Sequence, residues 1–280
     1  MSKYQIKILK MTNFYTLSTI IVILWMTPFL ITLFTAFKSM DEIFMNPNVW
    51  TPPSKWNFEN FKVAWSESRM SRYFVNTLIV AGTSTAGALF LSSLSAFALS
   101  WYEFKLKKFL IILFVTGMLI PFQMLLIPVY SFSIKVGLYD KLIGVILFHI
   151  AFQIGFCTFF LRNFMITIPV SLFEAAKIDG ANDFTIYWKI ILPLLKPAVA
   201  ALGILEFTWI WNDYLWSLIL LQNDVKKTVT IGLTSLQGQW ISSWNIIAAG
   251  SIIAAIVPII VFVIFQRYFI QGLTMGSVKG

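Results

Sequence analysis

The sequence predicts an all-α membrane protein with six transmembrane helices. Charged residues make up 12% of the 280 residues, about half of the roughly 25% that is usual in soluble domains. Apolar residues make up 58%, so too few polar groups remain to cover a water-exposed surface. Long uncharged apolar runs follow one another, and strand-like alternation is absent from the sequence. These observations exclude a soluble enzyme, a disordered chain and a nucleic-acid-binding module, although the net charge is +9.

Each transmembrane helix is predicted from a run of about 20 apolar residues, the length that crosses a hydrocarbon core of roughly 30 Å. Helices are expected because only helices and closed barrels satisfy backbone polar groups in lipid. Pro121 and Pro128 interrupt the third run, and Pro258 lies within the sixth, so both helices are expected to bend. The six predicted spans are 17–36, 73–102, 109–130, 142–161, 197–221 and 246–265.

The lysines and arginines predict the orientation, because they are more frequent on the cytoplasmic side. With the N-terminus inside, the inner pieces 1–13, 102–108, 162–196 and 266–280 hold 12 Lys and Arg against 4 acids. The outer pieces 38–72, 131–141 and 222–243 hold 9 against 6. Both the N- and C-termini are therefore expected to be cytoplasmic.

Three regions are expected along the chain. Residues 1–72 form an N-terminal tail, the first transmembrane helix and an outer loop. Residues 73–268 form a core of five transmembrane helices with a long cytoplasmic loop at 162–196. Residues 269–280 form a C-terminal cytoplasmic tail.

The sequence contains no arrangement that predicts a metal, a cofactor or a catalytic residue. Cys157 and His149 are the only cysteine and histidine, which excludes an internal disulfide and a zinc site of the Cys/His type. The phosphate-binding motif G-x-x-x-x-G-K-[ST] and the motif H-E-x-x-H are both absent. Any use of ATP must therefore depend on another chain.

The loop 162–196 is too long for a passive connection, and it contains signals for helices. Ser171 and Glu174 fit the S-x-x-E capping box, which predicts that a helix begins at Ser171. Gly180 is expected to end this helix in the left-handed conformation.

Asn182 is expected to cap a second helix. Pro193 is expected to end that helix, and Pro197 to begin the fifth span. A plain interfacial hairpin would fit the same spacing.

At these positions the sequence resembles the permease subunits of ATP-binding-cassette (ABC) importers. The segment Glu174-Ala175-Ala176-x-x-Asp179-Gly180-Ala181, followed by Ile190-x-Leu192-Pro193-x-x-x-Pro197, is similar to their EAA loop. Residues 211–216 (WNDYLW) and 266–280 (QRYFIQGLTMGSVKG) are similar to the carbohydrate branch of the family, the MalG-like subunits of maltose permeases. The resemblance covers essentially the whole chain.

This resemblance implies the ABC type I importer permease (MetI/MalG-like) fold in the bacterial cell membrane. It implies a translocation path shared with a second homologous permease, a sugar substrate delivered by an extracytoplasmic sugar-binding protein, and two cytoplasmic ATPase subunits that hydrolyse ATP. It implies no cofactor and no nucleic acid. The positions that match the ATPase-coupling motif are Glu174, Ala175, Ala176, Asp179, Gly180 and Ala181.

The C-terminal tail resembles one that reaches between the two ATPase subunits. Its glycines and lack of apolar periodicity predict an extended conformation from residue 271 onward. The positions expected to contact the ATPases are Gln271, Gly272, Thr274, Gly276 and Lys279.

Candidate residues of the solute path lie in and after the fifth span, namely Glu206, Trp209, Asn212, Asp213 and Trp216. Glu206 and Asp213 are two helical turns apart, so they are expected on roughly one face. They could form a polar wall for a sugar, hydrogen-bond between helices or subunits, or relay protons. The tryptophans could stack on sugar rings or simply pack, and His149 is expected to be a hydrogen-bonded packing residue.

The leading hypothesis is a permease subunit of an ATP-driven sugar (oligosaccharide) importer. One alternative is an ABC importer of another neutral solute, because no Lys or Arg lies within the predicted spans. The other is a proton-coupled secondary transporter, which needs no ATPase.

Overall fold

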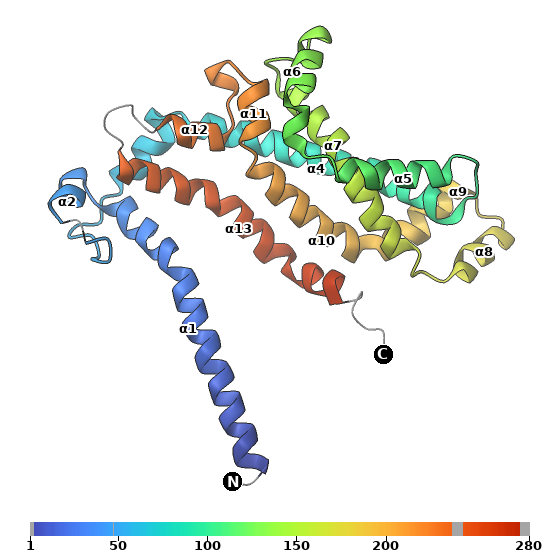
Figure 1. The fold of residues 1–280 in the computed structure, drawn as a ribbon, viewed down its shortest axis with the longest axis horizontal. Coiled ribbons are helices and arrows are strands. Elements are labelled where there is room, and N and C mark those ends of the chain that lie inside the picture. Colours follow the sequence, from blue (N-terminus) through green and yellow to red (C-terminus); the bar gives the residue numbers. More distant parts are fainter. Residues whose placement is uncertain (1–2, 47, 237–242, 275–280) are drawn as a thin grey trace. The chain divides into compact units, whose positions relative to one another are not determined.

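The computed structural model describes residues 3–46, 48–236 and 243–274. Within these ranges every regular element is helical, in agreement with the predicted class (Figure 1). Five described helical segments are long and apolar enough to cross a membrane. They are α1 (Lys3–Phe37), α4 (Met70–Trp101), α7 (Leu142–Met165), the segment Asp183–Trp211, which includes α10 (Leu192–Trp211), and α13 (Trp244–Thr274).

A bent pair of helices provides the sixth candidate span. The first helix of the pair is α5 (Lys107–Met118). The second part is the segment Phe122–Lys135, which includes η2 (Phe122–Leu125) and α6 (Leu126–Lys135). The chain bends by 97° between the two parts. The predicted six spans are confirmed when this pair is counted as one. Pro121 lies at the bend, directly before η2. Pro128 lies in the first turn of α6, where the missing N–H costs little, so the prediction that Pro128 also interrupts the span is wrong.

The fifth span begins earlier than predicted. α9 (Asp183–Thr185) continues through a π-helical turn, η3 (Ile186–Ile191), directly into α10. The prediction that Pro193 ends a helix is wrong, because Pro193 lies in the first turn of α10 and Pro197 lies inside it. The wider π-helical turn before Pro193 relaxes the clash between a proline ring and the preceding carbonyl groups.

The fifth span also ends earlier than predicted. α10 ends at Trp211, and a separate short helix, α11 (Leu215–Leu220), follows. Asp213 therefore lies outside the helix that contains Glu206. The prediction that these two acids share one helical face is wrong.

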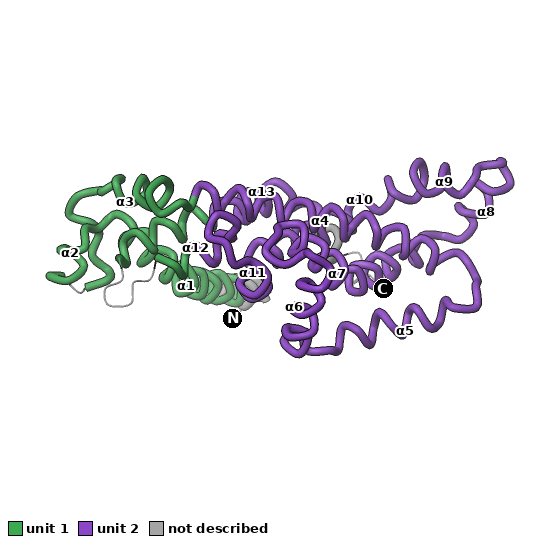
Figure 2. Tube along the Cα trace, turned by 90° about the horizontal axis from the view of Figure 1, so that it is seen from above, with its two compact units in different colours: residues 1–70, 233–254 green, residues 71–232, 255–280 purple. Residues whose placement is uncertain are grey.

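The chain divides into two compact units, coloured separately in Figure 2. Unit 1 contains residues 1–70 and 233–254, with α1, α2 (Met40–Met45), α3 (Glu59–Lys62), a π-helical turn (Val63–Glu67) and the beginning of α13. Buried Asn60 joins its elements: the amide nitrogen donates to the carbonyls of Ala36 (2.8 Å) and Lys38 (2.9 Å). Its Oδ1 accepts from the amide nitrogen of Asn245 at 2.9 Å. These bonds tie the end of α1 to α3 and to α13.

Unit 2 contains residues 71–232 and 255–280. Its main apolar core lies where α4, α7 and the segment leading into α10 meet. Small side chains such as Ala88, Ala96 and Cys157 are fully buried there, so the helices approach closely. The hydroxyl of Ser92 on α4 donates to the carbonyl of Ile154 on α7 at 3.2 Å. Unit 2 also carries α8 (Val170–Ile178), η4 (Asp224–Lys226) and the beginning of α12 (Val229–Ser235).

Candidate functional site

The loop 162–196 forms the predicted helix, glycine turn and second helix. α8 ends at Ile178, and Gly180 follows with φ +79°, a conformation that glycine adopts without steric cost. Asn182 then caps α9, because its Oδ1 accepts from the backbone N–H of Thr185 at 2.8 Å. The roles predicted for Gly180 and Asn182 in the backbone are confirmed.

The predicted start of the first helix is wrong. α8 begins at Val170 after Pro169, and no side chain caps its first amides. The fixed φ of Pro169, −57° here, is compatible with a helix that begins at the next residue. Ser171 and Glu174 therefore lie inside the helix, and Glu174 is exposed on its surface.

Aromatic packing attaches this segment to the core of unit 2. The ring of Phe173 on α8 stacks on Trp101 of α4, with centroids 5.7 Å apart and planes within 4°. The hydroxyl groups of Tyr187 and Ser93 lie 2.6 Å apart and share a hydrogen bond. These contacts hold α8 against α4, and α4 against the segment that leads into α10.

The surface of α8 and the following turn that faces away from the core combines small, polar and large apolar residues. Glu174, Ala175, Asp179 and Gly180 are exposed, Ala181 is half-buried, and Ala176 faces the core. Ile178 and Phe184, on either side of the glycine turn, are 86% and 72% exposed. These two residues were not among the predicted functional residues, although two large apolar residues beside a polar turn were a usable signal.

A cavity of about 710 Å³ lies between α7, α10 and α11. Its wall is largely aromatic, with polar groups from α7 and from the break after α10. Trp209, Asn212, Asp213 and Trp216 line it, together with His149, Gln153 and Thr208. The structure thus brings four of the five predicted path residues together, and adds two residues of α7 that the sequence placed in a different span.

Asp213 is occupied by contacts within the chain. Its carboxylate accepts from the backbone N–H groups of Trp216 (3.2 Å) and Ser217 (2.9 Å) and from the Ser217 hydroxyl (2.8 Å). His149 Nε2 lies 3.6 Å from Asp213 Oδ2. Asp213 therefore caps α11, and its negative charge is stabilised at the helix N-terminus.

The two cavity tryptophans differ in exposure. Trp216 is buried, and its ring centroid lies 3.8 Å from that of Phe148. Trp209 is 58% exposed. The Asn212 amide nitrogen donates to the carbonyl of Thr208 at 2.8 Å. Trp209 thus offers the larger free surface, while Trp216 mainly packs.

Glu206 does not line this cavity. It is fully buried in α10, and neither carboxyl oxygen has a hydrogen-bond partner among the described residues. In the same described ranges no group of three or more His, Cys, Asp or Glu side chains could hold a metal ion.

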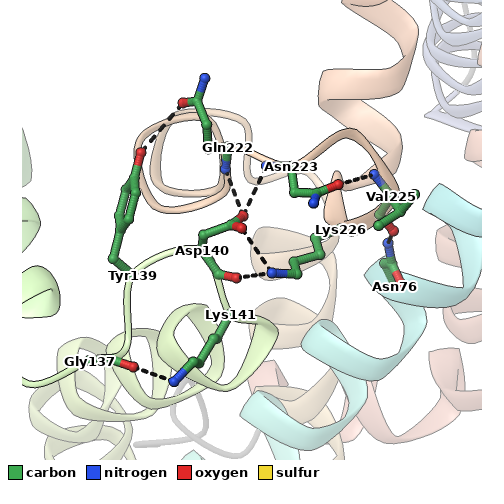
Figure 3. Close-up of polar contacts among 9 residues, drawn as sticks. All are labelled: Asn76, Gly137, Tyr139, Asp140, Lys141, Gln222, Asn223, Val225 and Lys226. Carbon is green, nitrogen blue, oxygen red and sulfur yellow. Dashed lines mark hydrogen bonds and ion pairs between the residues drawn. The ribbon is translucent and has the colours of Figure 1, made fainter.

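A polar cluster joins two loops of unit 2 beside α11 (Figure 3). The Asp140 carboxylate accepts from the backbone N–H groups of Gln222 (3.0 Å) and Asn223 (2.9 Å), and it pairs with Lys226 at 2.8 Å. The Asn76 amide on α4 donates to the carbonyl of Val225 at 3.0 Å. Burial alone would raise the pKa of Asp140, but Lys226 and the two backbone amides hold it below its usual value.

The C-terminal residues lie only partly within the described ranges. α13 continues to Thr274, so the backbone at Gln271, Gly272 and Thr274 is helical, and the predicted extended conformation is wrong there. These residues prolong an existing helix and need no new nucleation. Gly276 and Lys279 lie outside the described residues.

Comparison with known proteins gives consistent matches over the chain. Residues 70–275 match the family described as binding-protein-dependent transport system inner membrane component. The chain is 34% identical over 253 residues to the probable ABC transporter permease protein YurM of Bacillus subtilis, covering 90% of this chain and 83% of YurM. It is 32% identical over 260 residues to the arabinooligosaccharides transport system permease protein AraQ of Bacillus subtilis, covering 92% of each chain.

The fold also matches a solved structure. The TM-score is 0.83 against a chain of a bacterial ABC transporter involved in the import of the acidic polysaccharide alginate. The match covers 96% of this chain and 99% of that chain at 23% sequence identity.

Proposed function

Because this chain belongs to the binding-protein-dependent transport system inner membrane component family, we propose that it is the transmembrane permease subunit of an ATP-driven sugar importer in the bacterial cell membrane. Oligosaccharides are the proposed substrates. The observation that carries this proposal is the match to AraQ over 92% of both chains, since AraQ is named for the transport of arabino-oligosaccharides.

The proposed importer divides its work among several chains. This chain and a second homologous permease form the path, and an extracytoplasmic binding protein delivers the sugar. Two cytoplasmic ATPase subunits hydrolyse ATP, and this chain performs no catalysis. Its contribution is to couple hydrolysis in the ATPases to movement of the path. The proposed functional regions remain the N-terminal region (residues 1–72), the core (residues 73–268) and the tail (residues 269–280).

Coupling is assigned to the exposed segment around α8. Glu174, Ala175, Asp179 and Gly180 present a thin, polar ridge, and Ala176 and Ala181 lie closer to the core. This shape suits a groove on an ATPase, and the stacking of Phe173 on Trp101 supports transmission of force. The tail residues Gln271, Gly272, Thr274, Gly276 and Lys279 are proposed to contact the ATPases as well. Both assignments require the segment and the termini to be cytoplasmic.

Uptake by the complete importer in proteoliposomes tests this function. Uptake of a neutral oligosaccharide should require ATP, the binding protein and intact ATPase subunits, and an uncoupler should leave it unchanged. Uptake that survives inactivation of the ATPases but is abolished by the uncoupler would identify a proton-coupled transporter instead.

A further inference from the structure

We propose that the cavity between α7, α10 and α11 is a binding site for a neutral sugar within this subunit. The proposal rests on the proposed function for the class of solute, and it goes further by assigning the site. Its volume of about 710 Å³ lies in the range of small-molecule sites, about 300–1,000 Å³, which are typically apolar with a few polar groups.

The α7 side of the cavity offers two buried polar side chains. Gln153 is only 4% exposed, and it lines the cavity. His149 lies one helical turn away and is also buried, and its Nε2 lies 3.6 Å from Asp213 Oδ2, slightly beyond hydrogen-bond distance. Buried polar groups are normally paired, because an unpaired group loses its hydration without compensation. Sugar hydroxyls, which both donate and accept, would pair with both side chains.

The α10 side offers an aromatic surface. Trp209 is 58% exposed and lines the cavity, and Tyr214, which follows α10, lines the cavity as well. An aromatic ring packs well against the apolar C–H face of a sugar, while the hydroxyls at the sugar edge reach polar groups. Gln153 and His149 on one wall and Trp209 on the other thus match the two kinds of surface on a sugar ring.

The charges favour a neutral sugar over a uronate. No lysine or arginine is among the described residues that line the cavity. Asp213 is the only carboxylate among them, and three donors from Trp216 and Ser217 already occupy its oxygens. A uronate carboxylate would lose its hydration, find no cation and lie near a like charge.

Protection of an introduced cysteine tests binding at this site directly. Cys157 is the only native cysteine and is fully buried, so a thiol in the cavity is the accessible one on this subunit. The complete importer carrying Thr208→Cys is treated with a maleimide, with and without a non-hydrolysable ATP analogue. Labelling of this subunit is measured in the presence of arabinotriose, raffinose or maltotriose, or of an alginate trisaccharide.

At least one neutral trisaccharide should slow labelling severalfold in one of the two nucleotide states, and the alginate trisaccharide should not. Adding Gln153→Met or Trp209→Ala should reduce the sugar affinity measured by this protection about tenfold, as expected for losing one or two ligand contacts. Thr158→Val is the matched control, because Thr158 is a buried α7 residue whose hydroxyl has no partner among the described residues and does not line the cavity. It should leave the protection unchanged.

Two results would overturn the proposal: no protection by any neutral sugar in either state, or equal protection by the alginate trisaccharide. Asn212→Cys provides a second cavity thiol if the complex with Thr208→Cys does not assemble, and the same outcomes apply to it. The uptake assay separates this proposal from the proposed function. An importer with ATP-dependent sugar uptake but no protected cysteine retains the function and refutes the site. An importer without ATP-dependent uptake of any sugar refutes the function itself.

Discussion

The carboxylate of Asp140 joins two loops that are far apart in the sequence, and its charge is important for this link. Lys226 and the amides of Gln222 and Asn223 stabilise the ionised form, although burial opposes it, so the pKa is lowered. A lowered pKa means that the link stabilises the fold above the usual aspartate pKa, near 3.8. This stabilisation is lost as the pH falls through the lower pKa of the folded protein.

We therefore expect Asp140→Asn to lower the stability of the purified protein at pH 7 by about 1 kcal/mol, because the pair with Lys226 is partly exposed and water weakens it. Thermal unfolding measured from neutral pH down to about 3, below the usual aspartate pKa, should show the difference between wild type and variant shrinking with acid. Asp41→Asn is the control, since Asp41 is exposed on α2 and makes no side-chain hydrogen bond or ion pair within the described residues. A difference that stays constant with pH would contradict the role of the charge.

The turn between α8 and α9 depends on the positive φ of Gly180. No atom lies within 4 Å of a Cβ added there, so Gly180→Ala would cost only backbone strain, about 1–2 kcal/mol. That strain should distort the turn that presents α8. We expect sugar uptake to fall severalfold while the amount of protein in the membrane stays normal. Gly82→Ala serves as the control, because Gly82 lies in α4 with open space around it and without a positive φ. Equal uptake by both variants would show that the turn geometry is unimportant.

The exposed apolar residues beside this turn predict a contact with the ATPase subunits. Ile178 and Phe184 would each bury a large side chain on association, and loss of such a residue costs about 1–3 kcal/mol. Ile178→Ser and Phe184→Ser should each reduce co-purification of the ATPase about tenfold or more. Met45→Ser is a matched control, because Met45 is 87% exposed on α2, on the predicted outer side. Unchanged co-purification for all three variants would exclude this contact.

At the scale of the whole molecule, local signals predicted the fold and missed the tertiary contacts. Gly180 and Asn182 behave as predicted because a glycine stop and an asparagine cap depend only on neighbouring backbone. Pro193 does not end its helix, because a preceding π-helical turn accommodates the ring. Asp213 lies after the end of α10, where it caps α11 beside His149 of α7. No sequence pattern predicts this contact between Asp213 and α7. The aromatic and polar residues in and after α10 therefore predicted one part of the cavity. The wall formed by α7 could not be predicted from the sequence.

The energy source of the whole importer can be tested at Glu206. This side chain is fully buried without a hydrogen-bond partner among the described residues, a place where an ionised carboxylate is costly. If ATP drives transport, Glu206→Gln should retain most of the uptake and the same pH dependence, because glutamine has the shape of the neutral acid. A proton relay would instead require the acid itself. Uptake that becomes independent of pH in Glu206→Gln and collapses with an uncoupler in the wild type would favour proton coupling. Glu174→Gln is the comparison, because Glu174 is an exposed glutamate of the proposed coupling segment. This substitution keeps the size of the exposed side chain and removes its charge. Any loss of uptake with Glu174→Gln should therefore be accompanied by a loss of ATPase coupling. Glu206→Gln should reduce neither the uptake nor the ATPase coupling.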